Sequence, residues 1–492
     1  MSDLTSNPKP TAGGWRWDHS YARLPGRLFA RVNPEPVSEP RLVIFNRGLA
    51  EALGLDADQL DQPKAAGLFT GNQLPEGAWP LAQAYAGHQF GRFTILGDGR
   101  AILLGEHLTP RDERFDIQLK GPGRTPYSRG GDGRAALGPM LREFLISEAM
   151  HALGIPSTRS LAVAATGDPV FREETLPGAV LTRVAASHLR VGTFQWVAAH
   201  QDRELLQIVA DYTLQRHYPD RLAASNPYVE LLAGIVERQA ALIAQWQLVG
   251  FVHGVMNTDN MALSGETIDF GPCAFLDAFD PGTVFSSIDY QGRYAYGNQP
   301  DIAVWNLSRF AETLLPLIHA DSQHARELAL KVLQEFGGQF RRHWLGGLRA
   351  KLGLHTEESD DEALIDDLLE WMAATRADFT RTFRGLTENG GVLAGNVDLA
   401  FRAWHERWRA RIARQPQPLE EILGQMRRRN PAAIPRNHLV EAALVSATHG
   451  DLAPFRQLLS VLSAPYDDPP TGSDFIHPPP PETPPYRTFC GT

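Results

Sequence analysis

The chain has 492 residues, with 47 Lys and Arg against 57 Asp and Glu, which gives a formal net charge of −10. This acidic balance argues against a nucleic-acid partner, because sequence-independent binding to nucleic acid needs a basic surface. Hydrophobic residues make up 43% of the chain and charged residues 21%, which is typical of globular proteins and excludes a disordered or fibrous one.

Two cysteines, Cys273 and Cys490, are too few for a disulfide-stapled secreted scaffold or for a zinc site built from four thiolates. The first thirty residues contain no apolar run of the length of a secretory signal, and no stretch approaches the roughly 18 apolar residues of a membrane span. We therefore expect a cytoplasmic protein with no membrane partner. Its length allows a large enzyme of two lobes.

The predicted elements begin after an N-terminal extension, residues 1–40, which is rich in Pro, Gly and Trp. From residue 41 to residue 185 the hydrophobic period changes repeatedly between two and 3.6, so both strands and helices are expected. Residues 115–120 alternate between apolar and polar side chains, which predicts a strand that ends at Lys120. Apolar residues at helical spacing predict a helix between residues 139 and 154.

Residues 186–463 are predicted to be mostly helical, because apolar residues such as Val229, Leu232 and Val236 step by three and four. The last segment, residues 464–492, contains nine prolines, so we expect an extended tail. The chain is thus predicted to be α+β, with a small sheet-rich N-terminal lobe over residues 41–185 followed by a larger helical C-terminal lobe.

Two glycine-rich segments are candidates for binding phosphate. The first runs from Gly87-His-Gln-Phe-Gly91 to the turn signal Leu96-Gly97-Asp98-Gly99-Arg100, and the second is the loop 121–134, which holds five Gly and three Arg. Small residues let backbone N–H groups approach phosphate closely, and guanidinium groups pair with it. An ordinary hairpin turn for the first segment and a mobile surface loop for the second remain alternatives.

Lys120 and Glu143 have the order and spacing that kinases use for a phosphate-binding lysine. There, a carboxylate on the helix that follows the strand steers the ammonium group toward phosphate. A single Lys is usually a solvated charge, so the weight of this pair depends on the segments that follow it.

The strongest pattern lies between residues 253 and 271, where His253-Gly is followed by Asp259-Asn260 and then by Asp269-Phe-Gly. The catalytic and metal-binding segments of the kinase superfamily have the same order. Asn260 and Asp269 supply two hard oxygen ligands for Mg²⁺, which takes its other ligands from water and from nucleotide phosphates.

One position departs from the kinase pattern. The catalytic Asp of a kinase lies five residues before its metal-binding Asn, and here Val255 stands at that place. Asp259 is the only nearby carboxylate that can accept a proton instead. The sequence therefore argues against an ordinary kinase mechanism.

On these residues the sequence resembles the selenoprotein O family over nearly the whole chain. The motifs that carry the resemblance are Ala-Tyr-Ala-Gly-His-Gln-Phe-Gly at 84–91, Leu-Gly-Asp-Gly-Arg at 96–100, and the segments 118–129, 253–260, 269–272 and 434–438. The resemblance implies a two-lobed protein-kinase-like fold that binds ATP flipped relative to kinases. It also implies transfer of AMP from ATP, or of UMP from UTP, to Ser, Thr or Tyr hydroxyls of proteins, including its own, with release of pyrophosphate.

The resemblance further implies roles for individual residues. Asp259 is the expected proton acceptor, Glu143 the structural ion-pair partner of Lys120, and Asn260 and Asp269 the ligands of Mg²⁺ or Mn²⁺. The residues expected to bind the nucleotide are Gly97, Gly99, Arg100, Lys120, Asp132, Gly133, Arg183, Arg190 and Asp269.

The two cysteines differ in expected environment. Eukaryotic relatives end in a selenocysteine close to the C-terminus, and Cys490 holds that place here. We expect the Cys490 thiol to be exposed and open to reversible oxidation, whereas Cys273, in an apolar neighbourhood, is expected to be buried and unreactive.

Two other functions remain as alternatives. A small-molecule phosphotransferase of the aminoglycoside-kinase type is suggested by His253-Gly254 and opposed by Val255. An inactive nucleotide-binding scaffold is opposed by the presence of Asn260 and Asp269, because a mere platform does not need a complete metal site.

Overall fold

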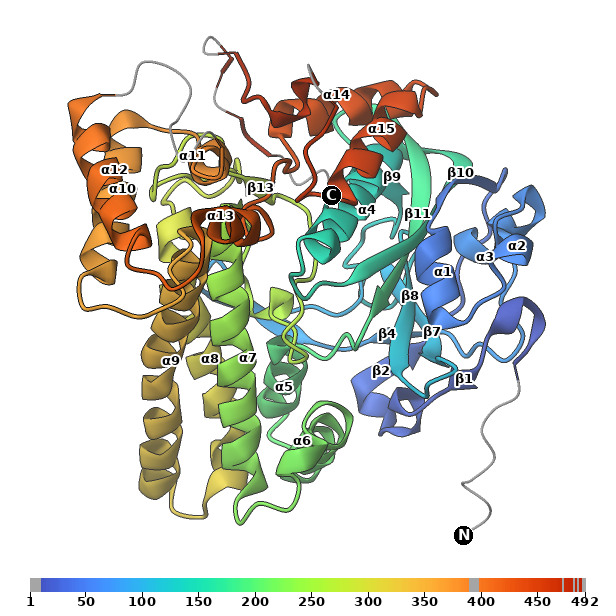
Figure 1. Ribbon diagram of the computed structural model, residues 1–492. Helices are drawn as coiled ribbons and strands as arrows, with labels where there is room; N and C mark the ends of the chain where they lie inside the picture. Colours follow the sequence, from blue (N-terminus) through green and yellow to red (C-terminus); the bar gives the residue numbers. More distant parts are fainter. Residues whose placement is uncertain (1–9, 389–397, 471–472, 481–482, 485, 489–492) are drawn as a thin grey trace.

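The computed structural model describes residues 10–388, 398–470, 473–480, 483–484 and 486–488 (Figure 1). The chain is a mixed α+β protein with one large sheet and many helices. In Figure 1 the sheet lies on one side of the molecule and a group of long helices on the other. Among the described residues, we find no helix with the length and apolar character that crossing a membrane requires.

The large sheet is antiparallel and contains nine strands in the described residues. Its main path runs in the order β2 (Phe29–Arg31), β4 (Leu81–Gln83), β7 (Ala101–Leu108), β8 (Arg114–Lys120), β11 (Thr175–Ala185), β10 (Arg159–Phe171) and β3 (Arg41–Phe45). Two further strands, β1 (Trp17–Asp18) and β9 (Ala135–Ala136), pair with β7 and β11. Strand β8 confirms the strand predicted from the alternation of residues 115–120.

Strand β8 is central, and the register places Lys120 at its end between Ala101 of β7 and Leu181 of β11. Ile117 and Leu119 are fully buried on the apolar side of the sheet. That side is covered by three short helices: α1 (Arg47–Leu53), α2 (Ala57–Leu60) and α3 (Ala66–Thr70).

Helix α4 (Leu137–Ala152) confirms the helix predicted between residues 139 and 154. It packs on β10 and β11, and its other side meets α14 (Asn437–Thr448) and α15 (Ala453–Leu462), as Figure 1 shows. The rings of Phe144 on α4 and Phe455 on α15 lie 6.4 Å apart within one buried cluster. Helices α14 and α15, which come late in the chain, therefore pack on the sheet side of the molecule. Among the described residues, they do not pack on the long helices of the other side.

The other side of the molecule is helical, and α7, α8 and α9 pack together lengthwise (Figure 1). Helix α7 confirms the periodicity seen around Val229 and Val236. The helices of this side are α5 (Val191–Ala199), α6 (Arg203–His217), α7 (Pro227–Val249), α8 (Gln299–Ile318), α9 (Ser322–Lys351), α10 (Asp361–Thr375), α11 (Phe379–Gly385), α12 (Leu399–Ile412) and α13 (Leu419–Arg427).

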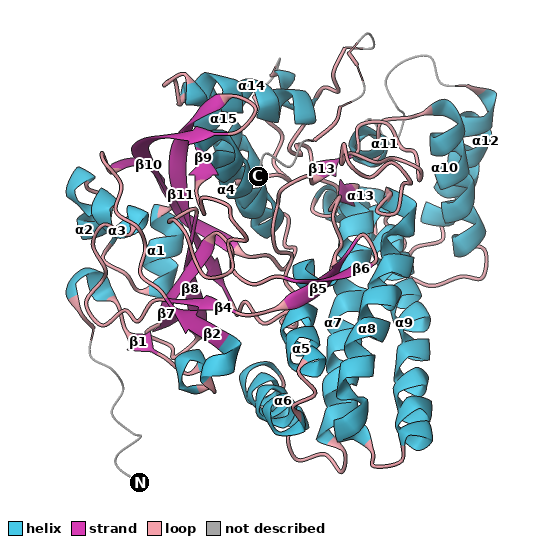
Figure 2. Cartoon of the chain, turned by 180° about the vertical axis from the view of Figure 1, so that it is seen from behind, coloured by secondary structure: helices cyan, strands magenta, loops and turns pink. Residues whose placement is uncertain are grey.

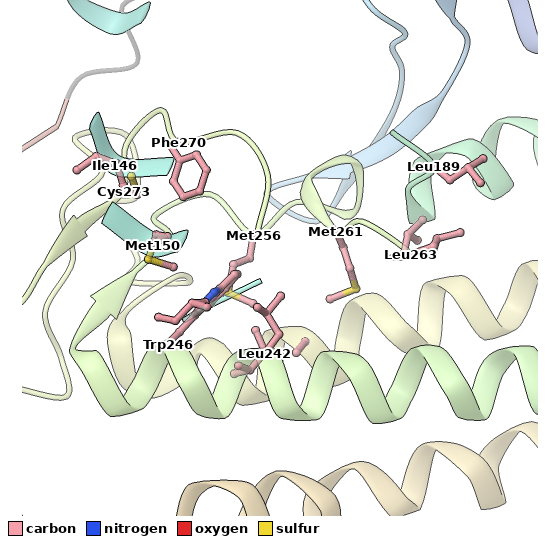
Figure 3. Close-up of a cluster of buried hydrophobic side chains, with 14 of the residues drawn as sticks. Ile146, Met150, Leu189, Leu242, Trp246, Met256, Met261, Leu263, Phe270 and Cys273 are labelled. Carbon is pink, nitrogen blue, oxygen red and sulfur yellow. The ribbon is translucent and has the colours of Figure 1, made fainter. Parts of the chain in front are cut away.

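Two small hairpins lie outside the large sheet. The hairpin β5–β6 (Ala86–Gln89 and Arg92–Ile95) leaves the large sheet and packs on α5 (Figure 2). The hairpin β12–β13 (Phe251–Val252 and Ala274–Phe275) encloses the loop 253–273. In Figure 3, Met256 and Met261 of this loop point toward Leu242 and Trp246 of α7, so apolar contacts hold the loop on the helical side.

The end of the chain returns to this loop. The backbone N–H of Thr488 donates to the Phe285 carbonyl at 2.8 Å, and its hydroxyl donates to the Pro272 carbonyl at 2.8 Å. Cys490 lies outside the described residues. Cys273 is fully buried, as predicted, and burial raises the pKa of its thiol to about 12.

Candidate active site

A cavity of about 570 Å³ lies between the glycine-rich turns and the loop 253–273. It is lined by all of the predicted site residues except Glu143: Gly97, Gly99, Arg100, Lys120, Asp132, Gly133, Arg183, Arg190, Asp259, Asn260 and Asp269. The structure thus brings together residues that lie up to 172 positions apart in the sequence, from Gly97 to Asp269. Val255, at the place of the kinase base, also lines the cavity.

Glu143 lies directly behind the cavity wall and joins its cations. The Lys120 Nζ donates to Glu143 Oε2 at 2.6 Å, and Arg183 donates to Glu143 Oε1 through Nε at 2.8 Å and Nη2 at 2.5 Å. All three side chains are at least nine-tenths buried. Burial alone would raise the pKa of Glu143, but Arg183 and Lys120 outweigh it and hold the pKa below its ordinary value.

Asp269 completes this cluster from the loop side. Its Oδ1 accepts from Lys120 Nζ at 2.5 Å and from Arg183 Nη2 at 3.3 Å. Burial raises the pKa of Asp269, but Lys120, Arg183 and Arg100 together hold it well below the ordinary value. Its backbone has a φ of 67°, a left-handed conformation that non-glycine residues adopt rarely. The buried cluster thus consists of two cations and two anions: Lys120, Arg183, Glu143 and Asp269.

Asn260 ends a short 3₁₀ turn, Thr258–Asn260, and its Nδ2 donates to the Val255 carbonyl at 3.0 Å. That bond orients the side chain, so that its amide oxygen and not its amide nitrogen is available to a cation. The described residues contain no group of three or more His, Cys, Asp or Glu side chains that could hold a metal ion. Asn260 and Asp269 still fit Mg²⁺, since this ion binds one or two protein oxygens and takes the rest from phosphate and water.

Asp259 precedes Asn260 and is 7% exposed. Its Oδ1 is buried, and we find no hydrogen-bond partner for this atom among the described residues. Burial raises the pKa of the Asp259 carboxyl to about 6. The backbone carbonyl of Asp259 accepts from Arg190 Nη1 at 3.1 Å, which joins the loop to the start of α5. A buried carboxyl of this kind is suited to accept a proton.

The two glycine-rich segments are hydrogen-bonded to each other. Thr125 Oγ1 donates to the Asp98 carbonyl at 2.6 Å, and Ser128 Oγ donates to the Gly99 carbonyl at 2.5 Å. The loop 121–134 is therefore packed against the first turn. These two hydrogen bonds favour an ordered binding loop over the alternative of a mobile surface loop.

Asp132 and Gly133 have structural roles within this second loop. Asp132 accepts from Arg172 Nη1 at 2.8 Å and from the backbone N–H of Arg134 at 3.0 Å. Gly133 has a φ of 66°, and a Cβ built on it would lie 1.9 Å from the Gly123 carbonyl oxygen. Only glycine fits there, because the Cβ of any other residue would collide with the backbone at Gly123 on the opposite side of the loop.

Sequence reasoning assigned no role to several residues that line the cavity. Tyr85 places its ring 4.4 Å from the Arg190 guanidinium, a cation–π contact. Gln89 and Asn257 also line the cavity, and the Gln89 side chain is hydrogen-bonded to the Asp259 carboxyl. The motif at 84–91 was the available signal for Tyr85 and Gln89. Its Gly87 and Gly91 indicated only a candidate phosphate-binding turn, and nothing in it pointed to a contact with Asp259.

The cations, the pair of oxygen ligands and the adjacent buried carboxyl suit a nucleotide-dependent transferase. Comparison with known proteins agrees: a family model described as protein adenylyltransferase SelO matches residues 15–463. The chain is 60% identical to "Protein nucleotidyltransferase YdiU" of Brevibacillus brevis over 492 residues, which cover 99% of this chain and 100% of the relative. Proteins of the same name from Anoxybacillus flavithermus (60% identity, 97% and 99% coverage) and Alkaliphilus metalliredigens (59%, 99% and 100%) are similar to it over nearly their whole length.

The chain belongs to the protein adenylyltransferase SelO family. It is an enzyme of the nucleotidyltransferase class, and its reaction uses a nucleotide and a protein acceptor.

Proposed function

We propose that this enzyme transfers AMP from ATP to Ser, Thr or Tyr hydroxyls of cytoplasmic proteins, including its own, and releases pyrophosphate. The observation that carries the proposal is the shared cavity of Asp259, Asn260, Asp269 and Lys120, with Val255 at the position of the kinase base. Asn260, Asp269 and Lys120 correspond to the residues that a kinase uses for metal and phosphate, while the carboxyl of Asp259 lies at a different sequence position from the kinase base.

We also propose that the two sides of the molecule are the lobes of a protein-kinase-like fold. The sheet side, residues 41–185, carries the nucleotide-binding loops, and residues 186–463 supply the catalytic and metal-binding loop. The contact between α4 and β8 through Glu143 and Lys120 supports this, because kinases use the same pair to complete their phosphate site. Helices α14 and α15 belong to the second segment in sequence and brace α4 in space.

The cations have a common role in binding the polyphosphate. Lys120, Arg100, Arg183 and Arg190 line the cavity and supply charge-assisted donors, while Gly97, Gly99, Asp132 and Gly133 shape the loops around the nucleotide. A divalent cation, Mg²⁺ or Mn²⁺, held by Asn260 and Asp269, would neutralise charge on the phosphates.

The transfer itself follows from the position of Asp259. The acceptor hydroxyl forms a bond to the α-phosphorus of ATP, the bond from that phosphorus to the bridging oxygen breaks, and pyrophosphate leaves. Asp259 accepts the hydroxyl proton, and Lys120, Arg183 and Arg190 stabilise the charge that develops on the leaving group. ATP must therefore lie flipped relative to kinases, with its α-phosphate toward the acceptor.

The proposal is tested by mass spectrometry of the purified enzyme and an acceptor protein after incubation with ATP and Mg²⁺, together with an assay for pyrophosphate. We expect an adenylyl adduct on hydroxyl side chains and one pyrophosphate for each adduct. A phosphoryl adduct would identify a kinase, and ATP binding with no adduct would identify a scaffold. UTP in place of ATP tests whether UMP is transferred as well.

Two substitutions test the separate roles of neighbouring carboxylates. Asp269→Ala should abolish both metal-dependent ATP binding and transfer. Asp259→Ala should lower kcat and leave ATP affinity within a few fold of the wild type, because a base acts on the acceptor proton and not on the nucleotide. An equal loss of ATP affinity in both variants would contradict the assignment.

A further inference from the structure

The motif at residues 84–91 has no role in the proposed chemistry, although it is one of the longest motifs of the chain. The structure places it in the hairpin β5–β6, which leaves the large sheet and packs on α5 and on the turn Thr258–Asn260 (Figure 2). A segment from the sheet side thus lies directly against the loop 253–273, which carries Asp259 and is called the catalytic loop from here on.

The hairpin is joined to the two residues that precede Asp259. The backbone N–H of His88 donates to Thr258 Oγ1 at 2.6 Å, and the backbone N–H of Phe90 donates to Asn257 Oδ1 at 3.0 Å. The Tyr294 hydroxyl donates to the same Asn257 oxygen at 2.6 Å. These bonds fix the distance between the hairpin backbone and the start of the catalytic turn.

A second set of bonds closes a ring through α5. The Thr258 hydroxyl donates to Gln195 Oε1 at 2.6 Å, and Gln195 Nε2 lies 2.7 Å from His88 Nδ1. Since Gln195 is 5% exposed and Thr258 is fully buried, water competes little for these contacts. The hairpin, α5 and the catalytic turn therefore form one rigid unit.

Within this unit Gly87 faces the Asp259 carboxyl. A Cβ built on Gly87 would lie 2.5 Å from Asp259 Oδ1 and 3.0 Å from its Cβ and Cγ. Gly87 does not have a left-handed φ, so its backbone conformation accepts alanine, and the Asp259 side chain is what excludes it. Asp259 Oδ1 has no hydrogen bond among the described residues, while the Gln89 side chain of the same hairpin is hydrogen-bonded to the Asp259 carboxyl. Packing against Gly87 and this bond therefore both limit the rotation of the carboxyl.

We propose that hairpin β5–β6 is the positioning element for the catalytic carboxyl, with Gly87 as the position on which Asp259 rests. The inference rests on the proposed role of Asp259 as proton acceptor. Transfer of the acceptor proton requires an oxygen within roughly 2.6–3.2 Å of the hydroxyl, and a misplacement of about 1 Å costs on the order of 100-fold in rate.

Gly87→Ala is the direct test. Its Cβ would be 0.9 Å closer to Asp259 Oδ1 than the 3.4 Å at which ordinary contact begins, so the carboxyl must rotate or move. We expect kcat for adenylyl transfer to fall on the order of 100-fold while the Kd for ATP and Mg²⁺ changes less than about threefold. A wild-type kcat in Gly87→Ala would overturn the inference.

The control is the same substitution in the Asp259→Ala background. If Gly87 acts through Asp259, then Gly87→Ala/Asp259→Ala has the same residual kcat as Asp259→Ala, because no carboxyl is left to displace. A further fall by the same factor as in the wild-type background would show a merely structural effect and would overturn the inference. A wild-type kcat in Asp259→Ala itself would show that Asp259 is not the proton acceptor. The proposed mechanism and this inference would then both be wrong.

A second pair of variants covers the case in which Gly87→Ala does not fold. Thr258→Val removes the hydroxyl that accepts from His88 and donates to Gln195, and Thr258→Ser keeps it. We expect kcat to fall roughly tenfold in Thr258→Val and to return to near the wild-type value in Thr258→Ser, with unchanged ATP affinity in both. Equal kcat values in the two variants would contradict a positioning role for the hairpin.

Discussion

Glu143→Gln removes one charge from the buried cluster at the back of the site. In the wild type, Lys120 and Arg183 are balanced by Glu143 and Asp269, and the ion-pair distances are 2.5–3.3 Å. Without the Glu143 charge, two buried cations share one carboxylate that is itself 31% exposed. Removing one partner of a buried pair destabilises proteins by about 3–5 kcal/mol, and we expect a loss of this size here.

The double variant Glu143→Gln/Lys120→Met removes one cation as well as one anion from the cluster. Arg183 and Asp269 are then left as one cation and one anion, so the double variant should be more stable than Glu143→Gln alone. It should be inactive in adenylyl transfer, because the phosphate-binding ammonium of Lys120 is absent. The assay is urea denaturation followed by tryptophan fluorescence, run beside adenylyl transfer on the same preparations. A double variant less stable than Glu143→Gln would refute the charge-balance argument.

Two further predictions concern residues away from the cavity. Lys351 is buried between Phe379 and Phe383, and burial lowers its pKa from 10.5 to about 7. Between about pH 7 and 10.5 the unfolded chain therefore binds more protons than the folded chain, so the free energy of unfolding should rise with pH by up to about 1.4 kcal/mol per pH unit. In denaturation measured from pH 7 to 10, Lys351→Met should flatten that rise. Arg436 is 1% exposed and donates to Asp277 and Asp378, so Arg436→Lys should lower thermal stability and leave ATP affinity unchanged, since an ammonium cannot make the forked contact; a wild-type melting temperature would contradict this.

The sequence predicted the elements around the site because each has a local pattern. The alternation that ends at Lys120 and the helical spacing around Glu143 correspond to β8 and α4. The same alternation could not show that the polar side of β8 is buried, since Asp116 and Gln118 are fully covered by side chains from other elements. Those partners lie far along the chain, and periodicity reports that a face is covered without saying by what.

Two features of the site depend on contacts between distant segments. The sequence predicted mostly helical structure up to residue 463, but only the structure shows that α15 packs against α4. The hairpin β5–β6 acts through backbone N–H groups bonded to Asn257 and Thr258, which lie 167 and 170 residues further on. Backbone donors leave no mark in residue type, so the sequence showed the motif without its role.

The central claim is that the nucleotide reacts at its α-phosphorus. The most direct measurement incubates the enzyme and an acceptor protein with ATP labelled at the α-phosphate and, in parallel, with ATP labelled at the γ-phosphate, using Asp269→Ala as the control. We predict that protein is labelled from the α-position only and that the label is absent with Asp269→Ala. Label transferred from the γ-position would make the enzyme a kinase and would contradict the account.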